Sequence, residues 1–220
     1  MATALEYIEK SKDRFLEELF FLLRIQSVST DSTKKGEITK ASEYLLTQFQ
    51  NIGLQNVQAF ETPGNPIVYG DYKAGEDKPT VLVYGHYDVQ PSDPDDLWIT
   101  HPFEPEIRDG NIYARGASDD KGQSFTHVKA IEALLRSDDG LDVNVKIILE
   151  GEEEIGSPNL VPFLESHKDL LSCDMVLISD TAMFGKDIPS ITYGLRGMAY
   201  MEVNVTGPNR DLHSGVYGGA

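Results

Sequence analysis

The sequence predicts an α/β protein with a mostly parallel sheet and helices on both faces. Short apolar runs such as "TVLVYG" and "MVLISD" alternate along the chain with longer amphipathic segments. This order is typical of strand–helix units that build one sheet. In addition, several of the apolar runs end directly in histidine, aspartate or glutamate, which suggests that one edge of the sheet carries chemistry.

Four segments have the pattern of helices. Residues 4–24 place Leu5, Ile8, Phe15, Leu19 and Leu22 near one stripe, which predicts an amphipathic helix. A second helix is expected over 39–50, because Gly53 follows as a stop signal. Further helices are expected over 122–136 and 159–171.

Strands are expected between these helices, over 56–61, 66–72, 80–85, 143–151 and 175–180. From Tyr193 the pattern changes: "YGLRGMAYMEVNVTG" has the alternation of a further strand, and "PNRDLHSGVYGGA" is a glycine-rich loop. We therefore place a domain boundary between residues 192 and 193. We expect residues 193–220 to be the first piece of a second, truncated domain.

Composition excludes some functions. The chain has 36 acidic and 19 basic side chains, a formal net charge of −17, which argues against nucleic-acid binding and is compatible with holding cations. Cys173 is the only cysteine, so no internal disulfide is possible and a reducing compartment is indicated. The N-terminus does not read as a signal peptide, and no run reaches membrane-spanning length. We expect a cytoplasmic protein without membrane or nucleic-acid partners.

The ends of three predicted strands carry side chains that bind metals. Carboxyl ends of parallel strands meet at one edge of a sheet, where ligands bind. Carboxylates gathered there repel one another unless a cation lies between them, and one imidazole with several oxygens suits zinc, manganese or cobalt. The residues concerned are His86 and Asp88, Glu152 to Glu154, Asp180, and the loop residues Asp119 and Asp120.

Each of these residues also has a simpler interpretation. His86 alone would more often be a hydrogen-bonded structural histidine, although Asp88 two residues later fits a carboxylate that orients a ligating ring. "EGEEEIGS" alone would usually be a solvated turn, and Asp180 could cap a turn. We expect the remaining helix and loop histidines, His101, His127 and His167, to be structural or solvated.

Five motifs, "GHYDVQP", "ARGASDDKG", "EGEEEIGS", "LISD" and "ITYGLRG" followed by "DLHSGVYGG", resemble the dizinc metallopeptidases that include acetylornithine deacetylase, glutamate carboxypeptidase and cytosolic nonspecific dipeptidase. "DVQP" and "DLHSGVYGG" resemble the dipeptidase and carnosinase branch in particular. The resemblance implies a zinc-peptidase-like catalytic domain whose N-terminal portion is residues 1–192. It also implies that residues 193–220 begin an α+β lid or dimerisation domain.

The resemblance assigns a role to each motif residue. Glu153 would be the general base, Asp88 would orient the ring of His86, and His213 would reach the partner subunit's site to bind the substrate carbonyl oxygen. The Asp119–Asp120 peptide would be cis. The metal ligands would be His86, Asp119 as the bridge between two ions, Glu154 and Asp180.

The implied activity is hydrolysis of a peptide bond in dipeptides or short peptides, by a water held between two divalent ions and activated by Glu153. Zinc is the favoured metal, with manganese or cobalt as alternatives, and the full-length protein would be a homodimer. Two alternatives stay open: an N-acyl amino acid deacylase of the same family, and an inactive truncated fragment. Family members are longer and supply a second ligating histidine later in the chain, so we expect this chain alone to be poorly active. A nucleotide-binding α/β domain is disfavoured, because no phosphate-binding loop follows a strand.

Overall fold

The structure is a computed structural model that describes residues 2–185, 187–213 and 215. It divides into two compact units, Met1–Thr181 and Ala182–Ala220. The helices and strands named below all lie in the first unit. The last part of the predicted glycine-rich loop, residues 216–220, lies outside the described residues.

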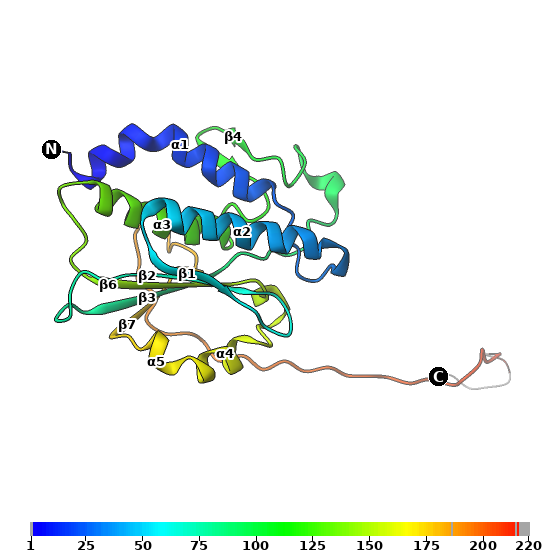
Figure 1. Ribbon diagram of the computed structural model, residues 1–220. Coiled ribbons are helices and arrows are strands. Elements are labelled where there is room, and N and C mark those ends of the chain that lie inside the picture. Colours follow the sequence, from blue (N-terminus) through cyan, green and yellow to red (C-terminus); the bar gives the residue numbers. More distant parts are fainter. Residues whose placement is uncertain (1, 186, 214, 216–220) are drawn as a thin grey trace. The chain divides into compact units, whose positions relative to one another are not determined.

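The first unit is an α/β layer structure (Figure 1). Its α-helices are α1 (Ala4–Arg24), α2 (Lys35–Ile52), α3 (Lys121–Arg136), α4 (Leu160–Ser166) and α5 (Lys168–Leu171). Its strands are β1 (Gln55–Phe60), β2 (Ile67–Tyr72), β3 (Thr80–His86), β4 (Glu106–Arg108), β5 (Asn111–Tyr113), β6 (Asn144–Glu150) and β7 (Met175–Ile178). Three short 3-10 turns are η1 (Ser32–Lys34), η2 (Asp95–Leu97) and η3 (Glu153–Ile155).

Five strands form one mixed sheet in the order β1-β2-β6-β3-β7. β3 pairs in parallel with β6 and with β7, whereas β2 runs antiparallel to both β1 and β6. In Figure 1, α1, α2 and α3 lie over one face of the sheet, and α4 and α5 lie over the other. The predicted α/β class with helices on both faces is confirmed, and the parallel part of the sheet is confined to β6, β3 and β7.

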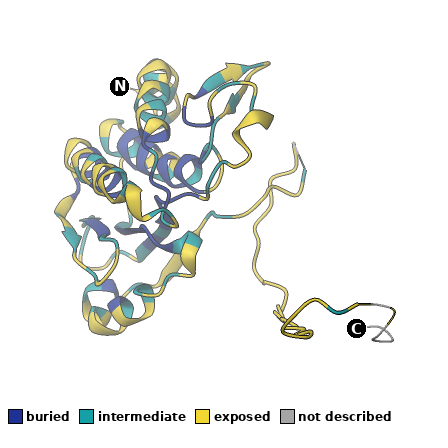
Figure 2. Ribbon diagram, turned by 90° about the vertical axis from the view of Figure 1, so that its right-hand side faces the viewer, coloured by how far each residue is buried: buried dark blue, intermediate teal, exposed yellow. Residues whose placement is uncertain are grey.

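Burial on both faces explains why the central strands are apolar almost throughout. Along β6, Ile147 and Leu149 pack into the core beneath α1, α2 and α3, while Ile148 between them packs beneath α4 and α5. Side chains alternate between the two faces of a strand, so neither face can be polar. Figure 2 shows this buried centre, whereas residues 182–213 are almost entirely exposed where they are described.

The helix α1 begins where its sequence signals place it. Thr3 accepts a hydrogen bond from the Glu6 backbone N–H, and the Glu6 carboxylate accepts one from the Thr3 N–H at 2.8 Å. This reciprocal cap satisfies two backbone donors that a helix start leaves without partners. The prediction of a helix over 4–24 is confirmed.

Two features of the structure differ from the sequence predictions. No strand forms in residues 193–207, all of which are described. The expected strand is wrong, because alternating apolar residues form a strand only where a neighbouring strand takes up the backbone hydrogen bonds. Conversely, the hairpin of β4 and β5 was not predicted. Its turn residues Asp109 and Gly110 have positive φ, as an Asp-Gly hairpin turn requires.

Gly122, at the start of α3, is packed too closely to carry a side chain. A Cβ placed there would overlap the carbonyl oxygen of Ala117, which is backbone and can yield only if the loop before α3 moves. We expect Gly122→Ala to lower the free energy of unfolding by about 1–3 kcal/mol, the usual cost of overpacking. Chemical denaturation measures this change.

Gly36 in α2 provides the matched control, because nothing lies within 4 Å of a Cβ built there. Gly36→Ala removes a flexible residue from a helix and should stabilise the chain by up to about 1 kcal/mol. Equal shifts in the two variants would show that the contact of Gly122 with the loop before α3 is unimportant.

Candidate metal centre

His86 is the buried centre of the candidate site. It is the last residue of β3, where it pairs in register with Glu150 of β6, and it is completely buried. Its Nδ1 lies 3.0 Å from the backbone oxygen of Asp88 and 3.4 Å from that residue's carboxylate. These contacts occupy one ring nitrogen and leave Nε2 to face the ends of the strands.

The Nε2 atom of His86 has no hydrogen-bond partner among the described residues, although it is buried. Three carboxylates surround it instead: Asp119 at 3.2 Å, Asp180 at 3.7 Å and Glu153 at 3.9 Å. A buried polar nitrogen without a partner is costly, and it is an atom that binds metals when the ring is neutral. The surroundings of this nitrogen therefore fit a cation.

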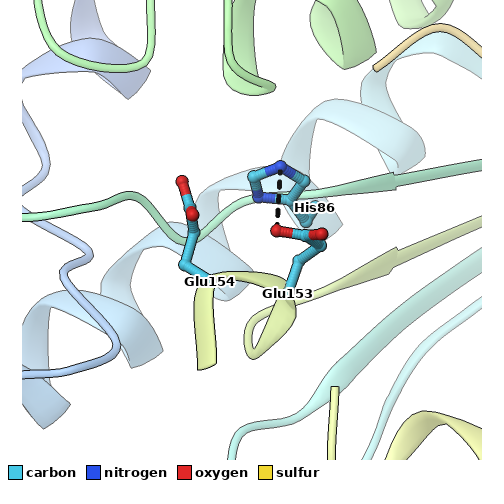
Figure 3. A group of neighbouring side chains, drawn as sticks. All are labelled: His86, Glu153 and Glu154. Atoms are coloured by element: carbon cyan, nitrogen blue, oxygen red, sulfur yellow. Dashed lines mark ion pairs between the residues drawn. The ribbon is translucent and has the colours of Figure 1, made fainter. Parts of the chain in front are cut away.

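Among the described residues, two groups of side chains could hold a metal, and His86 belongs to both. In the first group, one ligand atom each of His86, Asp119 and Asp180 lie within 4.8 Å of one another. In the second, the same is true of His86, Glu153 and Glu154, which Figure 3 shows side by side. The structure thus brings together every ligand that the sequence analysis assigned, and it adds Glu153, the predicted base, to the second group.

The acidic run after β6 divides into two parts. Glu153 and Glu154 open the turn η3 and approach His86 (Figure 3). Glu152 is buried, and its carboxylate accepts hydrogen bonds from the Asn65 backbone N–H at 3.2 Å and from the Asn159 amide at 2.7 Å. Glu152 is therefore structural, whereas the two residues after it belong to the site.

Asp88 fixes two parts of the site at once. Besides its contact with His86, its carboxylate accepts the backbone N–H of Glu153 at 3.2 Å and that of Glu154 at 3.1 Å. One buried carboxylate thereby holds both the ring and the turn that carries the two glutamates. The sequence analysis predicted the first role and missed the second, which depends on β3 and β6 being neighbours.

Gln90, in the "DVQP" motif, holds Glu154. Its side-chain amide donates to one Glu154 carboxylate oxygen at 2.7 Å, and its backbone N–H donates to the other at 3.2 Å. The sequence alone assigns no role to this glutamine. Because both oxygens are held, the orientation of the Glu154 carboxylate is fixed.

Asp119 and Asp120 precede α3, and the peptide between them is cis, as the resemblance implied. Asp119 is 63% exposed at its side chain, whereas Asp120 is buried and its carboxylate accepts from the His86 backbone N–H at 3.0 Å and from the Ser124 hydroxyl at 2.6 Å. A Cβ on Gly85 would overlap the Asp120 carboxylate and the Ser124 hydroxyl. Gly85 is thus what allows Asp120 and Ser124 to pack against the end of β3.

His213 lies in the second unit, where it is exposed and its Nδ1 accepts the backbone N–H of Gly215 at 3.1 Å. Its predicted role stays a prediction.

Electrostatics at the site follow from the gathered carboxylates. Burial lowers the pKa of His86, but the carboxylates of Asp88, Asp120 and Glu153 outweigh burial and raise that pKa to about 10. Partial burial, aided by Glu154 and Asp180 and opposed by His86, raises the pKa of Glu153. A raised pKa moves a carboxylate toward the range in which a general base works at neutral pH.

These shifts predict that metal binding releases a proton at pH 7. The ring of His86 is protonated there, because its pKa is about 10, and a metal binds only the neutral imidazole. The affinity for Zn²⁺ should therefore rise as the pH is raised from 6 toward 10. Isothermal titration at pH 7 in two buffers with different ionisation enthalpies tests this, since identical apparent enthalpies would contradict it.

The same pKa fixes the sign of the stability change in the metal-free chain. The folded pKa of about 10 lies above the ordinary value of 6.5. The contribution of His86 to stability is therefore complete below about pH 6.5 and is lost as the pH rises through about 10.

A sequence model of peptidase family M20/M25/M40 matches residues 82–212, which include every candidate ligand. The chain belongs to this family. It is 38% identical over 226 residues to the Cys-Gly metallodipeptidase dug1 of Schizosaccharomyces pombe, covering 97% of this chain and 48% of that protein.

Two further similarities point to dipeptidases. The Beta-Ala-His dipeptidase of Homo sapiens is 36% identical over 208 residues, which cover 94% of this chain and 39% of that protein. The solved structure of the dipeptidase Dug1p from Saccharomyces cerevisiae matches with a TM-score of 0.76 at 27% identity, covering 83% of this chain and 41% of that one. This M20/M25/M40 chain thus spans about half the length, or less, of these relatives. Membership of a metallopeptidase family implies divalent metal binding.

No helix among the described residues is both long and apolar enough to cross a lipid bilayer.

Proposed function

We propose that this chain forms the metal-binding part of a metallodipeptidase, which hydrolyses the peptide bond of dipeptides or short peptides. The observation that supports this most is the buried Nε2 of His86, which has no hydrogen-bond partner among the described residues and is shared by two groups of carboxylates. The relatives' names, Cys-Gly metallodipeptidase and Beta-Ala-His dipeptidase, support dipeptides as the substrate class.

His86, Asp119 and Asp180 fit one divalent ion, and we propose a second ion beside it, with zinc favoured for both. His86, Asp119 and Asp180 would hold the first ion, while Glu154 and a bridging Asp119 would contribute to the second. When bound, such ions polarise the amide carbonyl and make a water molecule acidic near neutral pH.

The remaining steps belong to side chains of this chain. Glu153 accepts a proton from the attacking water as the carbon–oxygen bond forms. It returns that proton to the amine nitrogen as the carbon–nitrogen bond breaks. Asp88 keeps the ring of His86 and the turn of Glu153 and Glu154 in place through the contacts described above. His213 would bind the substrate carbonyl oxygen in the site of a partner subunit. This role requires a homodimer, which we propose for the full-length protein, in the cytoplasm.

Metal analysis of purified chain tests this proposal first. After dialysis with Zn²⁺ and removal of free metal, about two ions per folded chain would support the two proposed ions. Hydrolysis of Cys-Gly and β-Ala-His is then measured with and without a chelator, and N-acetyl amino acids are tested beside them. A chain that is folded by circular dichroism and retains no metal would overturn the proposal, and cleavage of N-acetyl amino acids alone would point to a deacylase.

A further inference from the structure

One face of α3 contacts the segment that carries Asp180. Gln123 and His127 lie four residues apart and therefore on the same face of the helix. Both reach residues 179–181, just beyond the end of β7. From the sequence alone we expect His127 to be structural or solvated, and Gln123 has no predicted role.

Gln123 makes two hydrogen bonds with the backbone of Thr181, the residue that follows Asp180. Its side-chain oxygen accepts the Thr181 N–H at 3.3 Å, and its side-chain nitrogen donates to the Thr181 carbonyl at 3.3 Å. The same nitrogen donates to the Ser118 hydroxyl at 3.1 Å. Ser118 precedes Asp119 in the chain, so a single amide joins the neighbours of two candidate ligands.

His127 holds the other side of Asp180. Its Nε2 lies 2.7 Å from the hydroxyl of Ser179. Burial lowers the pKa of His127, which favours the neutral ring as the partner of a neutral hydroxyl. Residues 179 and 181 are thus both tied to α3, and Asp180 is the residue between them.

These contacts matter because the sheet does not position Asp180. β7 lies at the edge of the sheet and pairs only with β3 among the described residues, and that pairing ends at Tyr84 and Ile178. Asp180 lies two residues beyond the last pair, where the backbone has no ladder to fix it. Its carboxylate nevertheless lies 3.7 Å from the Nε2 of His86.

We propose that Gln123 and His127 are positioning residues that hold Asp180 beside Asp119 and His86, and so set the affinity of that group for a metal. This inference rests on the proposed function, in which the three residues bind one ion. A purely structural role is the competing explanation: the same contacts would then stabilise the fold without changing the affinity of the folded chain.

The experiment is titration of metal-free chain with Co²⁺, followed by the visible absorption of the bound ion and by calorimetry. The variants are Gln123→Met and His127→Phe, which keep size and lose the hydrogen bonds. Gln50→Met is the matched control, because Gln50 is an exposed glutamine on α2. Affinity is measured where circular dichroism and thermal unfolding show every variant to be folded.

Both variants should bind one Co²⁺ about 10–100-fold more weakly, the usual cost of losing a residue that orients a ligand, with an altered absorption spectrum. Gln50→Met should bind like the wild type. Ser179→Ala should reproduce His127→Phe, and combining the two should add little, since they remove the same contact.

The outcomes separate this inference from the proposed function. Wild-type affinity in both variants, with or without a lower unfolding temperature, would overturn the inference and leave the metal site standing. A folded wild-type chain that binds no Co²⁺ would overturn both. Weaker binding by the folded variants, with the Gln50→Met control unchanged, supports the positioning role.

Discussion

Replacing Glu153 by glutamine is expected to abolish hydrolysis and to leave metal binding nearly intact. Glutamine has the same shape, and the backbone N–H of residue 153 can still donate to Asp88. The glutamine side-chain amide, however, cannot accept the proton of the attacking water. General-base catalysis contributes about 10²- to 10⁴-fold, so kcat on a dipeptide should fall by that factor.

The readouts are kcat and metal content, measured on the same preparation. Glu165→Gln, on the exposed side of α4, is the control and should change neither. Turnover within a few-fold of wild type in Glu153→Gln would remove Glu153 from the role of base. A loss of metal together with activity would make it a ligand instead, which its place in the second group allows.

Replacing Asp119 by alanine should release metal. Its carboxylate lies 3.2 Å from the Nε2 of His86, and we propose that it bridges both ions. Loss of an orienting residue already costs about 10–100-fold in affinity, so loss of a bridging ligand should cost more, and dialysed protein should retain less than one ion. Elemental analysis measures this directly.

Asp96→Ala is the control for Asp119→Ala, because Asp96 is also an exposed aspartate, in the 3-10 turn η2. Both variants lose one negative charge from a chain of net charge −17, so a general electrostatic effect would appear in both. Equal metal content in Asp119→Ala and wild type would exclude Asp119 as a ligand.

The fold was predictable wherever a helix or strand has a recognisable local sequence pattern. The apolar stripe of α1 is present in the sequence and predicted the helix, and the buried strands are apolar runs of the expected length. α2 begins at Lys35, four residues before the predicted start. Ile38, which precedes Thr39, packs into the core and extends the apolar stripe of the helix toward its N-terminus. The β4–β5 hairpin is too short for a periodic pattern, and only its Asp-Gly turn could have indicated it.

The site was predictable for a different reason. Each candidate residue ends or follows a strand, or precedes a helix, so rules about sheet edges indicated the group, and the family resemblance singled out the ligands within it. The supporting contacts were not predictable, because they depend on strand order. That Asp88 would hold Glu153 and Glu154, or that Gln123 would bridge Ser118 and Thr181, follows only once β6 and β7 are known to flank β3.

The contact between Asp88 and the turn η3 has a consequence for the order of events in folding. It joins residues 65 positions apart in the chain, and it can form only after β3 and β6 have paired along their length. Closing so long a loop is slow and entropically costly. A metal ion therefore has no local set of ligands to gather in the unfolded chain, unlike the ion of a zinc finger. The polypeptide must fold first, and an ion then binds at a site that is already built.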